Sequence, residues 1–80
     1  MSDAVNELLK QLEGAYAPST LRGYRNDYGQ FASFCKERGE SPLPAAPTTV
    51  VEFLEFRAET VKLSTLEHSA TSISTLHRLS

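Results

Sequence analysis

Two arginines close to a helix start are the side chains of this sequence best suited to bind a polyanion. Arg22 and Arg25 lie three positions apart, with Thr20 and Gly23 beside them, just after Pro18. The first N–H groups of a helix attract phosphate, and an arginine can bind phosphate or donate two hydrogen bonds to guanine. These four residues are therefore candidates for contact with a nucleic acid, and the alternative is a solvated helix face.

A second polar segment near the C-terminus carries hydroxyl and imidazole groups. Short hydroxyl side chains on a helix can reach phosphates or base edges without charge repulsion, and a histidine can do either. The alternative is a Ser/Thr-rich face that meets only solvent. The candidates for DNA contact are Ser64, Thr65, His68 and Ser72, and Thr71 and Thr75 belong to the same polar face.

Residue patterns typical of enzymes are not found in the sequence. It has no cluster of metal ligands, no nucleophile paired with a base and no glycine-rich phosphate loop, so we expect neither catalysis nor a cofactor or metal. Cys35 is the single cysteine, so we expect it to be a buried apolar residue, with a reactive thiol as the alternative. His77 falls on an apolar helix side, where a packed and hydrogen-bonded histidine is expected.

The composition is that of one soluble domain, and its charge argues against strong DNA binding. The 80 residues are 40% hydrophobic and 22% charged, with a net charge of −2. Phosphate binding responds to local charge density, so this acidity is compatible with DNA binding if the few cations lie together. No apolar run approaches the roughly 20 residues of a membrane span and no signal peptide is visible. We therefore expect a cytoplasmic protein with no membrane partner.

Hydrophobic spacing predicts an all-α domain of four helices within residues 1–80. The strongest apolar stripe runs from Leu21 to Cys35 in steps of three and four. Three prolines within 41–47 predict a stiff connector. The predicted helices cover about 4–13, 20–38, 49–61 and 64–79. The side chains expected in one core are Leu21, Tyr24, Tyr28, Phe31, Phe53, Leu54, Leu66, Ile73 and Leu76.

Polar residues and glycines predict where the helices begin and end. A hydroxyl before a helix can accept a hydrogen bond from its first N–H groups, and a Glu three residues later completes a capping box. The predicted caps are Ser19, Thr48 or Thr49 (Thr49 paired with Glu52), and Ser64 paired with Glu67. Gly14 and Gly39 are expected to follow the first two helices, since glycine readily takes the left-handed C-terminal position.

Several short motifs occur together in one order. The pair Ser19-Thr20 is followed by Arg22-x-Tyr24 and by Phe34-Cys35. Residues 44–54 join a proline connector to a Val-x-x-aromatic-Leu helix, and Leu76-His77-Arg78 closes the last helix. In this order and with these connector lengths, the chain resembles the N-terminal core-binding domain of tyrosine recombinases of the phage-integrase kind.

The resemblance implies a SAM-like four-helix domain that clamps duplex DNA at a recombination site together with a catalytic domain. Other recombinase subunits on the DNA would be further partners. Catalysis in the family uses two arginines, a His-x-x-Arg unit and a tyrosine nucleophile. Neither His68 nor His77 is followed by arginine three residues later, so the resemblance assigns catalysis to a domain outside this chain. Accordingly, Tyr16, Tyr24 and Tyr28 are not expected to be nucleophiles.

Two other functions remain open from the sequence. One is a helical protein-interaction module, for instance in recombinase subunit assembly. The other is an independent helix-turn-helix regulator, which the long proline connector disfavours because that motif needs a tight turn. A DNA titration that perturbed the third helix, near Glu52, Glu55 and Glu59, would favour the interaction module.

Overall fold

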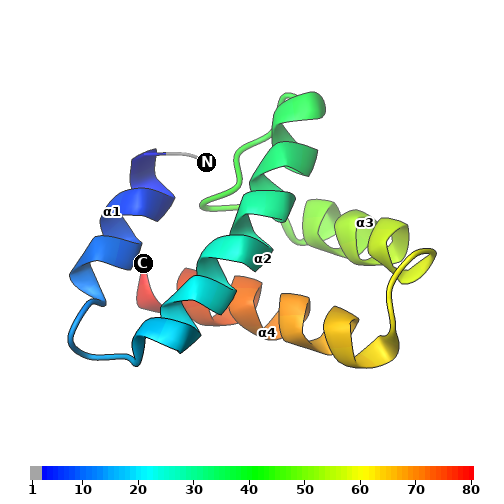
Figure 1. Ribbon diagram of the computed structural model, residues 1–80. Coiled ribbons are helices and arrows are strands. Elements are labelled where there is room, and N and C mark those ends of the chain that lie inside the picture. The colour runs from blue at the N-terminus through cyan, green and yellow to red at the C-terminus, as the bar shows by residue number, and fades with distance from the viewer. Residues whose placement is uncertain (1–2) are drawn as a thin grey trace.

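The chain folds into four α-helices, which confirms the predicted all-α class. The computed structural model describes residues 3–80. Its helices are α1 (Asp3–Gln11), α2 (Pro18–Glu37), α3 (Pro47–Ala58) and α4 (Leu63–Leu79) (Figure 1). The largest departure from the predicted bounds is at the end of α3, which stops at Ala58 instead of residue 61. None of the helices in the described range is long and apolar enough to cross a membrane.

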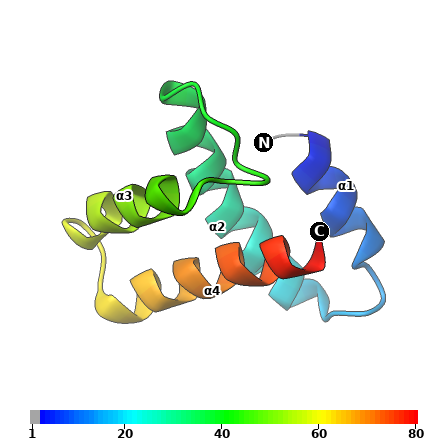
Figure 2. The same ribbon diagram turned by 180° about the vertical axis from the view of Figure 1, so that it is seen from behind.

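The second helix is the centre of the arrangement. In the two opposite views, α1 and α3 lie on either side of α2, and α4 crosses α2 at a steep angle (Figures 1 and 2). The most extensive contact is between α2 and α4. The described part of the molecule is flat, 35 × 27 × 17 Å, so most helices have one face in the core and another in solvent.

Aromatic rings fill the space between α2 and α3. The Phe31 ring lies 5.1 Å from the Phe53 ring and 5.6 Å from the Tyr28 ring, measured between centroids, and Phe34 lies 5.3 Å from Phe53. Such edge-on or tilted pairs add to the stabilisation from apolar burial. The stripe predicted on α2 is therefore the central surface of the core.

The core also differs from the predicted set at a few positions. Tyr24 and Leu54 are only partly buried against it, and Leu66 is half-buried. Helix α1 contributes three buried side chains that were not in the predicted core. The buried apolar cluster comprises Val5, Leu8, Leu9, Leu21, Tyr28, Phe31, Phe34, Cys35, Phe53, Ile73 and Leu76.

Prolines, and not the predicted hydroxyls, begin two of the helices. Pro18 and Pro47 each occupy a first helical position of α2 and α3, where the fixed φ of proline suits the helix and its missing N–H costs nothing. The residues before them make no side-chain cap hydrogen bond. Ser19 therefore lies inside the first turn of α2, and its prediction as a cap is wrong.

The two predicted capping boxes do not form either. Thr49 is buried inside α3, and its hydroxyl donates a hydrogen bond to the Glu40 carboxylate of the preceding connector. Glu52 instead pairs with Arg38. Helix α4 begins at Leu63, so Ser64 lies in its first turn and caps nothing.

Both predicted glycine positions have left-handed backbone conformations. Gly14 has a φ of 88° and Gly39 a φ of 69°. At the end of α2, the N–H groups of Gly39 and Glu40 donate to the carbonyls of Lys36 and Cys35, which closes the helix.

The proline connector between α2 and α3 is held on two sides. The Tyr28 hydroxyl donates to the Pro42 carbonyl over 2.5 Å, and the Ala45 N–H donates to Nε2 of His77 over 2.9 Å. The other ring nitrogen of His77, Nδ1, lies 2.8 Å from the Ile73 carbonyl. His77 is thus packed and hydrogen-bonded, as predicted, and it fixes the connector to α4.

Candidate nucleic-acid interface

The N-termini of α2 and α4 are open to an anion. Neither helix has an acidic residue in its first turn, and neither N-cap residue, Ala17 or Lys62, makes a side-chain cap hydrogen bond. The unpaired N–H groups of a first turn, together with the helix dipole, attract negative charge. Exposed hydroxyls at Thr20, Ser64 and Thr65 lie in these same turns.

The two arginines of α2 are unpaired cations. Arg22 and Arg25 are exposed, and neither forms an ion pair or side-chain hydrogen bond with any residue from 4 to 80. Arg38, at the other end of the same helix, differs in both respects. Its guanidinium lies 2.6 Å from the Glu52 carboxylate and 4.3 Å from the centre of the Phe34 ring. Arg22 and Arg25 are therefore free to bind an anion, whereas Arg38 is already paired with a carboxylate.

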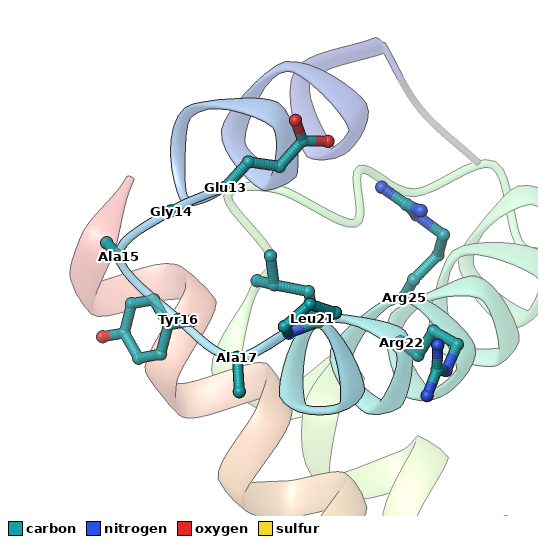
Figure 3. A pocket seen from close by; sticks show the side chains of 9 residues that line it. Glu13, Gly14, Ala15, Tyr16, Ala17, Leu21, Arg22 and Arg25 are labelled. Atoms are coloured by element: carbon teal, nitrogen blue, oxygen red, sulfur yellow. The ribbon is translucent and has the colours of Figure 1, made fainter.

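A hollow of about 710 Å³ lies beside these arginines. It is lined by the turn from Glu13 to Pro18 and by Leu21, Arg22 and Arg25. Figure 3 shows Arg25 reaching across the hollow towards α1, on the side where the Glu13 carboxylate also points, whereas Arg22 turns away from it. Both arginines line the hollow, but their guanidinium groups point in different directions.

A buried carboxylate connects α2 to α4 at their crossing. Asp27 is 6% exposed, and its Oδ2 accepts a hydrogen bond from the Ser72 hydroxyl at 2.6 Å. The same oxygen lies 2.5 Å from Nδ1 of His68. The His68 ring also covers Gly23, where a Cβ would lie 3.4 Å from the ring. Gly23 and Asp27 on α2 thus face His68 and Ser72 on α4, each pair four residues apart.

These contacts bring the two predicted segments together. Arg22 directly precedes Gly23, which is covered by His68, and the His68 side chain is 61% exposed. In both overall views the first turns of α2 and the length of α4 follow the same edge of the molecule (Figures 1 and 2). We call the predicted contact residues of these segments that are exposed, together with Gly23, the α2–α4 surface. It consists of Thr20, Arg22, Gly23, Arg25, Ser64, Thr65 and His68.

One predicted member of this surface is misplaced. Ser72 is fully buried, because its hydroxyl is turned towards Asp27 between the helices. Thr75, expected on the same polar face, is also buried, whereas Thr71 is exposed. The prediction that Ser72 lies on the exposed polar face is therefore wrong.

Asp27 is the residue that the sequence did not indicate. Nothing in the apolar stripe distinguishes a buried carboxylate from a solvated one. A usable signal was the matched spacing, because a glycine and an aspartate four apart on α2 meet a histidine and a serine four apart on α4.

Two other groups with possible chemistry lie in the core. Burial raises the pKa of the Tyr28 hydroxyl well above its ordinary value, and the nearby Cys35 adds to the rise. Burial also raises the pKa of the Cys35 thiol, with a smaller contribution from Glu40. Both groups are held in their neutral forms, and Cys35 is buried as expected. Within residues 3–80, no three side chains of His, Cys, Asp or Glu are grouped so that they could hold a metal ion.

Comparison with known proteins gives one informative similarity. The chain is 34% identical over 68 residues to a protein of Selenomonas ruminantium named "Integrase/recombinase xerD homolog". The match covers 85% of this chain and 20% of the relative, so the chain spans about a fifth of the relative's length. No family profile matches the chain. No solved structure matches it.

Proposed function

We propose that this chain is the N-terminal core-binding domain of a tyrosine recombinase of the integrase kind and that it binds duplex DNA. Its similarity to a protein named integrase/recombinase supports a relationship to that family. The order of motifs from Ser19 to Arg78 and the all-helical fold agree with it.

The α2–α4 surface is the part of the chain that we assign to DNA. Protein–DNA interfaces use arginines, hydroxyls and helix N-termini to contact phosphates, while arginines can also bind guanine in the major groove. This surface combines the free cation of Arg22, two helix N-termini without acidic residues, and exposed hydroxyls. The observation that carries the proposal is the His68 ring over Gly23, which joins the two segments, together with the unpaired Arg22 that precedes Gly23 in the chain.

The chain acts as one part of a larger enzyme in this proposal. Strand cleavage and joining belong to a catalytic domain outside the chain, and the two parts close around the duplex. Other recombinase subunits on the same DNA are further partners. The domain itself supplies no catalytic residue and no cofactor. Because few cations are available, binding by the isolated domain is weak, with a dissociation constant of about 10⁻⁴ to 10⁻⁶ M.

Chemical-shift mapping tests this assignment. The ¹⁵N-labelled chain is titrated at low salt with a duplex about two helical turns long. Amide shifts are expected at Thr20, Arg22, Gly23, Arg25, Ser64, Thr65 and His68. The buried amide of Ser72 is expected to respond less than these. Shifts that avoid both helix starts would contradict the assignment.

A protein-interaction function is the second candidate, and α3 carries the observation that favours it. Val51 and Phe56 are 55% and 56% exposed, beside the acidic residues Glu52, Glu55 and Glu59. Exposed apolar side chains of this size are typical of contacts with another protein, and the acidic neighbours repel DNA. Shifts centred on α3, or no response to DNA at millimolar concentration, would favour this function over DNA binding.

A further inference from the structure

The geometry around His68 fixes which of its ring nitrogens carries the proton. An ionised carboxylate can only accept hydrogen bonds, and Oδ2 of Asp27 lies 2.5 Å from Nδ1 of His68. The Ser72 hydroxyl donates to the same oxygen. Nδ1 of His68 must therefore be the protonated nitrogen, and the neutral ring has a bare lone pair at Nε2.

This tautomer limits what His68 can bind. Phosphate oxygens at neutral pH are acceptors, so the lone pair at Nε2 cannot bond to them. A second proton, at Nε2, turns the ring into a cation with a donor on its exposed side. The side chain is 61% exposed, whereas that of Asp27 is only 8% exposed. The negative charge that balances the imidazolium is thus buried beneath the ring, and the new donor has access to solvent.

The other histidine shows the opposite arrangement. Nδ1 of His77 faces the Ile73 carbonyl, an acceptor, and Nε2 accepts a hydrogen bond from the Ala45 N–H. Both ring nitrogens of His77 are therefore hydrogen-bonded. A second proton, at Nε2, would lie against the Ala45 N–H and break that hydrogen bond. Of the two histidines, His68 is the one whose free nitrogen can gain a proton and bind an anion.

We propose that His68 is a proton-linked phosphate contact, so that the domain takes up one proton at this ring when it binds DNA. Asp27 supplies the counter-charge, and Ser72 and Gly23 hold the carboxylate and the ring in place. The inference deepens the proposed function and depends on it. The protonated form of His68 is the form that binds phosphate, so the affinity of the domain for DNA falls as pH rises.

The charged surroundings of His68 are few in the described residues. On α2, Asp27 touches the ring, and Arg22 and Arg25 are the cations of that half of the helix. On α4, Glu67 precedes His68 and is exposed. Near the end of α3, which packs on α4, the charged residues are Arg57, Glu59 and Lys62. Arginine, lysine and ionised glutamate do not change charge between pH 6 and 8, whereas histidine ordinarily does.

The test is the dissociation constant for a fluorescein-labelled duplex, measured by anisotropy at pH 6, 7 and 8 and constant ionic strength. The unaltered chain should bind about three- to tenfold more weakly at pH 8 than at pH 6, because one titrating group is involved. His68→Gln keeps a polar side chain without titration in this range, so its affinity should not change with pH. Circular dichroism checks that the variant is folded.

The outcomes separate this inference from the proposed function. Binding that is independent of pH in the unaltered chain overturns the proton linkage and leaves DNA binding standing. A pH dependence that survives in His68→Gln also overturns it, because the effect then belongs to another titrating group such as His77 or the α-amino group. No binding at any pH overturns both proposals.

A second measurement is independent of any variant. Long-range ¹H–¹⁵N NMR spectra of the imidazole nitrogens should show the Nδ1–H tautomer of His68 at high pH. Added DNA should move the titration of His68, but not that of His77, to higher pH, because proton and DNA binding are reciprocal. An Nε2–H tautomer in the free protein would contradict the proposal.

Discussion

Replacing Phe31 by alanine should remove the central ring of the core. Phe31 is 0% exposed, and its ring lies within 5.6 Å of the rings of both Tyr28 and Phe53. The substitution forfeits the transfer free energy of a buried aromatic ring and leaves a cavity that rigid neighbouring rings cannot fill. We expect a loss of about 3 to 5 kcal/mol in the free energy of unfolding.

That loss is large for a domain of this size. At about 0.05 to 0.15 kcal/mol per residue, a domain as small as this one has a total stability of about 4 to 12 kcal/mol. Urea denaturation followed by far-UV circular dichroism measures the change. If Phe31→Ala is unfolded without urea, Phe31→Leu keeps most of the apolar volume and should cost about 1 to 2 kcal/mol.

The matched control is the same substitution at a surface ring. Phe56 is 56% exposed, although its ring lies 5.6 Å from that of Phe34. Phe56→Ala should therefore cost about 1 kcal/mol or less. Equal losses for Phe31→Ala and Phe56→Ala, or a Phe31→Ala domain that melts like the unaltered one, would refute the placement of the α2 stripe at the centre of the core.

Three further predictions concern contacts around the core. Cys35 is fully buried with a raised pKa, so alkylation by iodoacetamide should be at least about a hundredfold slower in the folded than in the urea-unfolded chain, as followed by mass spectrometry. Tyr28→Phe leaves the Pro42 carbonyl without its donor and should cost about 1 to 2 kcal/mol in urea denaturation. Glu52→Gln removes a half-exposed ion pair with Arg38 and should cost less than about 1 kcal/mol by the same assay.

The helices and most of the core could be predicted because periodicity reports burial directly. The stripe containing Tyr28 and Phe31 repeats every three or four residues over about four turns of α2. The proline connector was equally visible, since proline is excluded from helix interiors. The helices, the core stripe and the connector could therefore be predicted, because each depends on a pattern of nearby residues.

Helix starts were mispredicted because two local rules compete. A hydroxyl cap gains one hydrogen bond, but a proline in the first turn fixes the backbone in the helical conformation without losing any. Pro18 and Pro47 begin their helices before Ser19 and Thr49 can act as caps. Thr49 then finds its partner in Glu40, nine residues away, which no local rule indicates.

The candidate surface was only partly predictable, because which residues of one helix are exposed depends on how the other helix packs against it. Arg22 and Ser64 are exposed, as their positions opposite the apolar residues predicted. Ser72 was assigned to the polar face because serine is polar, yet the crossing of α2 over α4 buries it against Asp27. The point at which two helices cross depends on how their side chains pack together. The hydrophobic periodicity of one helix alone does not predict that point.

The central claim is that the α2–α4 surface binds DNA. It is tested most directly by replacing single cationic residues with alanine and measuring the affinity for DNA. Anisotropy of a labelled duplex should show that Arg22→Ala raises the dissociation constant about three- to tenfold and reduces the salt dependence by about one counterion. Lys36→Ala, which removes one charge from the exposed far end of the same helix, should bind like the unaltered chain. Equal affinity for Arg22→Ala and the unaltered chain, or an equal loss in Lys36→Ala, would contradict the claim.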